Sequence, residues 1–305
     1  MNMWAETILS MLRAVRRERP LIHMLPNQVT AAFCADAIAA VGGRPLMALA
    51  PEEMPEIVSH AKGLAVNMGQ PGKEKGLACA LALETAKDAG LYTMFDPVGA
   101  GASVYRRELA KHLLAIPWPG VVKGNGAELA ALFAEGLTHE GVDSLEEYEN
   151  ESAVEAFLRH ASASGRLLVV AQTGKIDRIL WIDPASGFLR RILVEGKKEG
   201  EQTLVGTGCV AGAVMGTLLA AVRGEEKRRK DDKVSVLQMG EKAMLEAERL
   251  ALAAAGAVGI VSFCKERQPG MAGYGTGKTA FLDALGCLDE AACGRYLETH
   301  IREGK

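Results

Sequence analysis

The sequence predicts an α/β layered fold with a mostly parallel central sheet and an antiparallel hairpin near one edge. In the first half of the chain, short β-rich runs alternate with longer helical segments, the order expected for a sheet with helices on its faces. The stretch 178–195, "RILWIDPASGFLRRILVE", has two alternating runs around Pro-Ala-Ser-Gly, which is typical of a β-hairpin. After it the chain is nearly all helical. A length of 305 residues, 49% of them hydrophobic, provides ample material for a core.

Each element has its own signal. Residues 1–18 carry apolar side chains at helical spacing and predict an amphipathic surface helix. Buried parallel strands are predicted where apolar runs end in residues that favour a loop, at 45–50, 63–69, 91–99, 120–125 and 166–174. Helices are predicted between them at 30–41, 73–90 and 104–115. The apolar stretch 250–263 is shorter than the ~20 residues that span a bilayer, so it predicts a buried helix and no membrane segment.

Composition and charge argue against several classes of protein. The net charge is −3, and basic residues are concentrated only around 223–233, so nucleic acid is not expected as a partner. The six cysteines are scattered without a Cys-x-x-Cys pair, which argues against a disulfide framework or a zinc cage and predicts a cytoplasmic protein. The charged stretches 135–152 and 223–233 are expected to be exposed loops or helix ends, the second as a charged loop insert.

Two glycine-rich segments resemble nucleotide-binding motifs, but each lacks a glycine that its motif requires. "GYGTGKT" at 273–279 would need glycine at position 272 to be a P-loop, and that residue is Ala272. "GAGAS" at 99–103 lacks the third glycine of a dinucleotide fingerprint and follows the third predicted strand rather than the first. Neither segment therefore predicts the function.

Polar residues at the strand ends predict the site instead. Ligands of such sheets bind outside the carboxyl ends of the strands, where the chain has Asn67, Asp96, Asn125, Glu128 and Thr173. Four segments there suit one nucleotide site: 95–103, 122–129, 171–177 and 206–213. Asp96 and Glu128 can supply oxygen ligands for Mg²⁺, directly or through water.

The segment 206–213, "GTGCVAGA", predicts an anion hole at a helix N-terminus. The backbone N–H groups of Gly206, Thr207, Gly208 and Cys209 can hold a phosphoryl group that gains charge during transfer. The thiol of Cys209 is then a candidate for chemistry, because a helix N-terminus favours its ionised form. The alternative is that the glycines are turn residues, Asp96 caps a helix and Cys209 merely packs.

These segments, together with "NQVT" at 27–30 and "GGRPLMA" at 42–48, resemble the hydroxyethylthiazole kinase family of the ribokinase-like group over about residues 20–290. The resemblance implies that Met47 contacts a thiazole, that Asn27 and Val29 line its pocket and that Gly206 lies beside the reacting hydroxyl. It also implies that Thr173 contacts the nucleotide, that Asp96 and Glu128 lie near metal and phosphates, and that Cys209 is the general base. Lys123 stands where the family commonly has a phosphate-contacting arginine, so the charge is kept and the bidentate fork is lost.

The resemblance implies a single ribokinase-like α/β/α kinase domain over 1–305. Its expected reaction is the ATP- and Mg²⁺-dependent phosphorylation of 4-methyl-5-(2-hydroxyethyl)thiazole, a salvage step towards thiamine, in a homotrimer with active sites between subunits. Two alternatives stay open: a kinase for another small alcohol, and an ADP-dependent dehydratase that repairs hydrated nicotinamide cofactors. The block of Asn27, Val29 and Met47 favours the thiazole, and Cys209 stands where such dehydratases typically have Asp.

Overall fold

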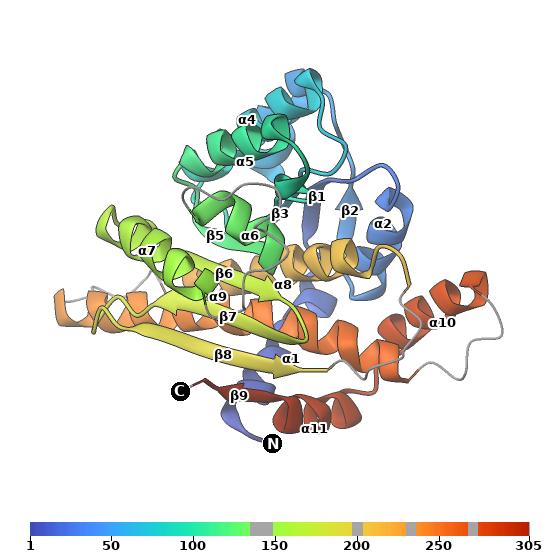
Figure 1. Cartoon of the computed structure of the whole chain (residues 1–305). Coiled ribbons are helices and arrows are strands. Elements are labelled where there is room, and N and C mark those ends of the chain that lie inside the picture. The colour runs from blue at the N-terminus through green and yellow to red at the C-terminus, as the bar shows by residue number, and fades with distance from the viewer. Residues whose placement is uncertain (135–148, 197–203, 230–235, 268–273, 305) are drawn as a thin grey trace.

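A nine-stranded mixed sheet organises the described part of the chain, in the order β2-β1-β3-β4-β5-β6-β7-β8-β9 (Figure 1). The computed structural model describes residues 1–134, 149–196, 204–229, 236–267 and 274–304. Strands β1 to β6 run parallel to one another. They are β1 (Leu21–Leu25), β2 (Arg44–Leu46), β3 (Gly63–Asn67), β4 (Thr93–Asp96), β5 (Gly120–Asn125) and β6 (Leu168–Thr173). Strands β7 (Ile176–Ile182), β8 (Leu189–Glu195) and β9 (Ile301–Glu303) add to this edge antiparallel. The fold class predicted from the sequence is confirmed.

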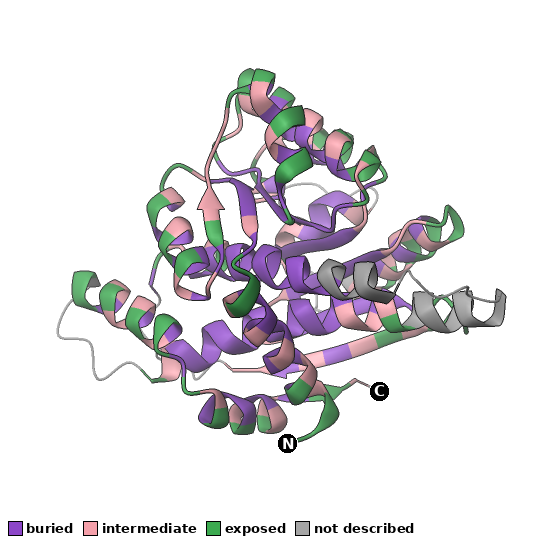
Figure 2. Ribbon diagram, turned by 180° about the vertical axis from the view of Figure 1, so that it is seen from behind, coloured by how far each residue is buried: buried purple, intermediate pink, exposed green. Residues whose placement is uncertain are grey.

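Helices cover both faces of the sheet, and each face has its own hydrophobic cluster. The first face packs against α1 (Met3–Glu18), α2 (Ala31–Ala40), α8 (Thr207–Arg229), α9 (Val236–Glu266), α10 (Tyr274–Gly286) and α11 (Glu290–His300). The second packs against α3 (Met54–His60), α4 (Lys73–Asp88), α5 (Val104–Ala115), α6 (Gly126–Phe133) and α7 (Glu149–Ala163). Figure 2 shows the buried residues concentrated in the central strands and in the two long helices beside them. The layers are therefore α/β/α.

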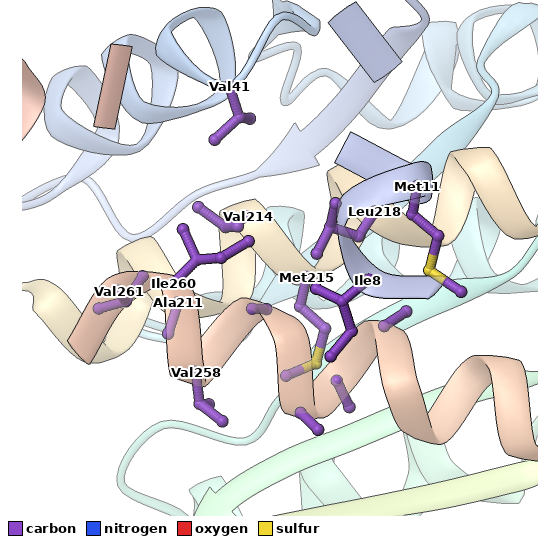
Figure 3. Packing of buried hydrophobic residues seen from close by; sticks show 14 of the residues in the cluster. Ile8, Met11, Val41, Ala211, Val214, Met215, Leu218, Val258, Ile260 and Val261 are labelled. Carbon is purple, nitrogen blue, oxygen red and sulfur yellow. The ribbon is translucent and has the colours of Figure 1, made fainter. Parts of the chain in front are cut away.

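The N-terminal helix is amphipathic, as its sequence predicts. Asn2 caps α1 by accepting the N–H of Ala5 on its side chain, and Arg19 ends it in the left-handed conformation. Its apolar side is fully buried: Ile8 and Met11 lie beside Met215 and Leu218 of α8 (Figure 3). Burial of such side chains stabilises the fold by about 1.5–3 kcal/mol each, so α1 is an integral part of the first cluster.

Small residues bring α8 close to the sheet. A Cβ added at Gly216 would lie 2.9 Å from the Cβ of Ala65, and one added at Gly63 would lie 2.5 Å from the carbonyl oxygen of Gly216. Only glycine allows this approach between α8 and β3. With α8 packed in this way, its N-terminal residues Gly208 and Cys209 lie at the carboxyl ends of β5 and β3, near Lys123 and Asn67.

Most predicted elements are present, with four differences. The predicted strand 45–50 is shorter, as β2 ends at Leu46, and β1 and β9 have no counterpart in the prediction. The charged segment 223–233 is not wholly a loop, because α8 continues to Arg229; residues 230–233, like 135–148, lie outside the described residues. The apolar stretch 250–263 lies in a longer apolar segment of α9, Leu245–Glu266, which is long enough to cross a membrane by length and composition. Because 89% of its most apolar window is buried inside the protein, it is a core helix, as predicted.

Candidate active site

Three polar side chains form a row at the carboxyl ends of adjacent parallel strands. Asn67 of β3 pairs in register with Asp96 of β4, and the pairing of Phe95 with Val122 places Lys123 of β5 next to Asp96. Their exposures are 0%, 2% and 5%. All three face α8: the Nδ2 of Asn67 lies 3.2 Å from the Sγ of Cys209, and Lys123 and Asp96 face its first turns.

An ion pair joins two members of this row. The Nζ of Lys123 donates to the Oδ2 of Asp96 at 2.9 Å, and a Cβ added at Gly208 would lie 3.9 Å from the same Nζ. Burial raises the pKa of the Asp96 carboxyl against the opposing effect of Lys123. Burial would lower the pKa of Lys123, but the carboxylates of Asp96 and Glu128 outweigh it and raise that pKa. Lys123 therefore stays positively charged where a phosphate could reach it.

The N-terminus of α8 faces the ion pair. Gly206 has a φ of +95°, and a Cβ added there would come within 2.7 Å of the Cγ2 of Thr30, so glycine is required on both counts. Thr207 uses its N–H and its hydroxyl to bond the carbonyl of Leu204, at 3.4 and 3.2 Å. Of the predicted anion hole, the amide of Thr207 is thus engaged within the chain. The amides of Gly208 and Cys209 lie in the first turn of α8, where a helix start leaves N–H groups to an incoming anion.

Glu128 holds two loops together at this edge. Its Oε2 accepts the N–H of Asn125 at 2.9 Å, and the Oδ1 of Asn125 accepts the N–H of Glu128 at 2.8 Å, which is a capping box at the start of α6. Its Oε1 accepts the N–H of Gly99 at 2.8 Å. The carboxylate is near enough to Asp96 and Lys123 to shift the pKa of both. It also fastens the turn after β4 to α6.

The residues predicted to bind substrate and nucleotide lie in different surroundings, from exposed to half-buried. Asn27 lies against Gly69, where an added Cβ would be 2.6 Å from its Nδ2, and its Oδ1 accepts the N–H of Val29 at 3.0 Å. Val29 itself is 67% exposed. Met47, just after β2, is half-buried and packs against the cluster on the α8 side of the sheet. Thr173 ends β6 in register with Asn125, which places it beside the α6 capping box.

Two residues in this region make contacts that the sequence does not predict. Asn67 is one of the polar strand ends that predict the site, but its contact with Cys209 crosses 142 positions of the chain. Lys75 in α4 donates from Nζ to the carbonyl of Pro26 at 2.7 Å and to that of Gly69. A lysine in "GKEKG" has the sequence signal of a surface charge, so nothing local could have predicted this role.

The donor set suits a metal held mostly by other ligands. No three His, Cys, Asp or Glu side chains converge on one point in the part of the chain that the structure describes. Asp96 gives one oxygen to Lys123, and each oxygen of Glu128 accepts one N–H. A carboxylate oxygen has more than one lone pair, so these two groups fit Mg²⁺ bound by phosphate oxygens and water, with the carboxylates as its protein contacts.

A mostly parallel sheet with a lysine, two carboxylates and a helix N-terminus at its strand ends defines a small-molecule kinase of the ribokinase-like group. The sequence model of the "Hydroxyethylthiazole kinase family" matches residues 12–289. The chain belongs to the hydroxyethylthiazole kinase family.

Similar proteins cover from two thirds to nearly all of the chain. A hydroxyethylthiazole kinase of Tolumonas auensis is 30% identical over 300 residues, which are 96% of this chain and 97% of that protein. One from Shouchella clausii is 34% identical over 209 residues, 68% of this chain and 76% of that protein. The solved structure of a hydroxyethylthiazole kinase protein from Pyrococcus horikoshii covers 98% of this chain and 100% of its own, with a TM-score of 0.72 and 24% identity, and supports the same fold.

Proposed function

We propose that the protein transfers the γ-phosphoryl group of ATP to the hydroxyl of 4-methyl-5-(2-hydroxyethyl)thiazole, a salvage step towards thiamine. The observation that carries this proposal is the meeting of the Cys209 thiol, the Asp96–Lys123 pair and the start of α8 at one point of the sheet. A hydroxyl placed between the thiol and the anion-binding amides would lie in line with a phosphoryl group.

In the proposed step the chain mainly positions groups and balances charge. The substrate oxygen forms its bond to the γ-phosphorus while the bond from that phosphorus to the β-bridging oxygen of ATP breaks and ADP leaves. The thiolate of Cys209 takes the hydroxyl proton. Lys123 and the amides of Gly208 and Cys209 stabilise the phosphoryl oxygens. Mg²⁺ would neutralise phosphate charge, and Asp96 and Glu128 would hold its water ligands.

Substrate and nucleotide contacts follow the family resemblance. Asn27 and Gly206 lie near Asn67 and Thr30 respectively, at the rim of the α8 N-terminus. We assign Asn27, Val29, Met47 and Gly206 to the thiazole alcohol and Thr173 with Lys123 to ATP. Lysine in place of the family arginine keeps the charge and forms a buried ion pair, which gives it a structural role as well.

A coupled ADP-release assay against a panel of thiazole alcohols, pyrimidine alcohols and sugars tests the reaction. We expect ADP release with the thiazole alcohol far above that with the other alcohols. Turnover with another alcohol alone would replace the substrate and keep the kinase. No ADP release with any alcohol, together with ADP-dependent dehydration of a hydrated nicotinamide cofactor, would establish the dehydratase instead.

We further propose a cytoplasmic homotrimer with active sites between subunits. Val29 and Val205 are large apolar side chains that are 67% and 59% exposed, and they flank α2 and α8 beside the site. A second copy of the chain would cover them. The six cysteines are free, which fits a reducing compartment. Light scattering of the active enzyme should give three times 32.4 kDa, and an active monomer of that mass would reject the trimer.

A further inference from the structure

Asn67 is buried beneath the start of α8 and uses both ends of its side-chain amide. Its Oδ1 accepts the N–H of Gly69 at 2.9 Å, and its Nδ2 donates to the Sγ of Cys209 at 3.2 Å. Turning the amide over would place its NH₂ against the N–H of Gly69, which puts two donors face to face. Gly69 therefore fixes the orientation, and a hydrogen-bond donor must face the sulfur.

A donor facing Cys209 makes its sulfur the acceptor. A neutral thiol accepts weakly, whereas a hydrogen bond to an ionised sulfur is charge-assisted and stronger. We infer that Asn67 is a positioning residue that holds the Cys209 sulfur in its proton-accepting form and orientation. This inference rests on the proposed function, in which that sulfur takes the proton of the alcohol.

A second layer of contacts fixes the Gly69 peptide. Lys75 donates to the carbonyls of Gly69 and Pro26, and the missing Cβ of Gly69 leaves room for Asn27 on one side and for the Oδ1 of Asn67 on the other. The turn that orients Asn67 is thus tied to the segment Pro26–Asn27, which is assigned to the substrate. A shift of that segment would be transmitted to the donor that faces Cys209.

Titratable and charged groups face Cys209 from three neighbouring elements. Cys34 on α2, Lys75 on α4 and Lys123 on β5 interact electrostatically with it, and Asp96 and Glu128 lie beside Lys123. Asp96 and Lys123 compensate each other as a pair. Burial raises the pKa of Cys34 to about 12, so that thiol is neutral and contributes no charge. The two oxygens of Glu128 each accept an N–H bond, and Lys75 is the basic group on α4 that interacts with Cys209.

The test measures the sulfur itself, through the pH dependence of alkylation by iodoacetamide in a Cys287→Ser background. Cys287 is exposed and Cys209 is half-buried, whereas the other four cysteines are buried. Asn67→Asp keeps the acceptor for Gly69 and replaces the donor to the sulfur with an acceptor. Asn2→Asp is the matched control, because it makes the same amide-to-acid change and keeps the acceptor for a backbone N–H, that of Ala5, at the start of α1 and outside the four segments of the site.

Asn67→Asp should slow alkylation of Cys209 at pH 7 by about tenfold, the scale of one hydrogen bond to a charged group. It should also move the acid limb of the kcat profile to higher pH with little change in the KM for ATP. Asn2→Asp should do neither. Unchanged alkylation and an unchanged profile in Asn67→Asp would overturn the inference. If Asn67→Asp fails to fold, Asn67→Ala removes the same donor and must give the same two changes.

A double-mutant cycle separates this inference from the proposed function. In Cys209→Ala, Asn67→Asp should cause no further loss of kcat, because its effect passes through the sulfur. An equal loss in both backgrounds would overturn the inference while leaving Cys209 as the base. Full kcat in Cys209→Ala alone would overturn the proposed role of Cys209. Alkylation needs no turnover and still decides whether Asn67 acts on the sulfur.

Discussion

Replacing Lys123 with methionine removes one half of a buried ion pair and should strongly destabilise the fold. The Nζ of Lys123 and the Oδ2 of Asp96 are 2.9 Å apart, with side-chain exposures of 6% and 2%, so water cannot replace the lost partner. Breaking such a pair by removing one member costs about 3–5 kcal/mol of the free energy of unfolding. We expect Lys123→Met to lose that amount near neutral pH and to lose turnover.

The loss should depend on pH with a definite sign. Burial already raises the pKa of Asp96 above 3.8 with Lys123 present, and the pKa should rise further when the lysine, which opposes this shift, is removed. Below pH 3.8 the carboxyl is protonated in both states and the unpaired charge disappears. As the pH rises through the window above 3.8, the unfolded chain loses this proton first, so the folded state binds more protons and loses stability. The deficit of Lys123→Met relative to the wild type should therefore grow from pH 4 to pH 8.

Urea unfolding at several pH values measures this difference. The double variant Asp96→Asn with Lys123→Met is the control, because it removes both charges and keeps the shape of the carboxyl. It should recover most of the stability and none of the turnover. An exposed ion pair contributes up to about 1 kcal/mol. If the free energy of unfolding of Lys123→Met at pH 8 lies within that amount of the wild-type value, the pair is not desolvated and the reasoning is wrong.

Three further outcomes are expected. In Cys209→Ala, kcat should fall by about 10²–10⁴-fold while ATP binding is kept. Cys209→Asp should stay active, because a carboxylate is ionised at working pH. If the alanine variant keeps full kcat, Cys209 is only a packing residue. Glu128→Gln should lose turnover at saturating Mg²⁺, which kcat measures. It should also lose about 1 kcal/mol of stability, which calorimetry measures, because one of the two backbone N–H groups that Glu128 accepts would then face the NH₂ of the glutamine. Burial lowers the pKa of His23 below 6.5, so the unfolded chain takes up the proton first and stability should fall as the pH drops below 6.5. The unfolding midpoint of His23→Leu should change less over that range.

The sequence predicts the layers and most strands because burial on both faces leaves long apolar runs that end in turn residues. The strand β1 is five residues between Pro20 and Pro26, and such a short apolar run has no alternation to distinguish it. The strand β9 forms only because the chain end returns to β8, where Ile301 pairs with Val194. That pairing is a long-range contact with no local signal.

Within the site, too, some residues have a local sequence signal and others depend on long-range packing. Asp96, Lys123 and Cys209 lie in segments whose glycines and spacing predict a phosphate site, and the fold brings them together as parallel strand ends must. Lys75 and Asn67 act through contacts with Pro26, Gly69 and Cys209 that depend on how α4 and α8 pack. Their sequence context is that of a surface charge and of an ordinary strand end.

The polar groups of the site have protein partners before any ligand arrives. Asp96 is bound by Lys123, Glu128 by two backbone N–H groups and Asn67 by Gly69. Such prior bonding lowers the reorganisation required when phosphate charge develops, because the donors are already oriented. It also means that a metal ion that binds a carboxylate directly must compete with Lys123 or with a helix cap. Contact through water leaves both partners in place, and for this reason we expect Asp96 and Glu128 to act on the metal chiefly through its water ligands.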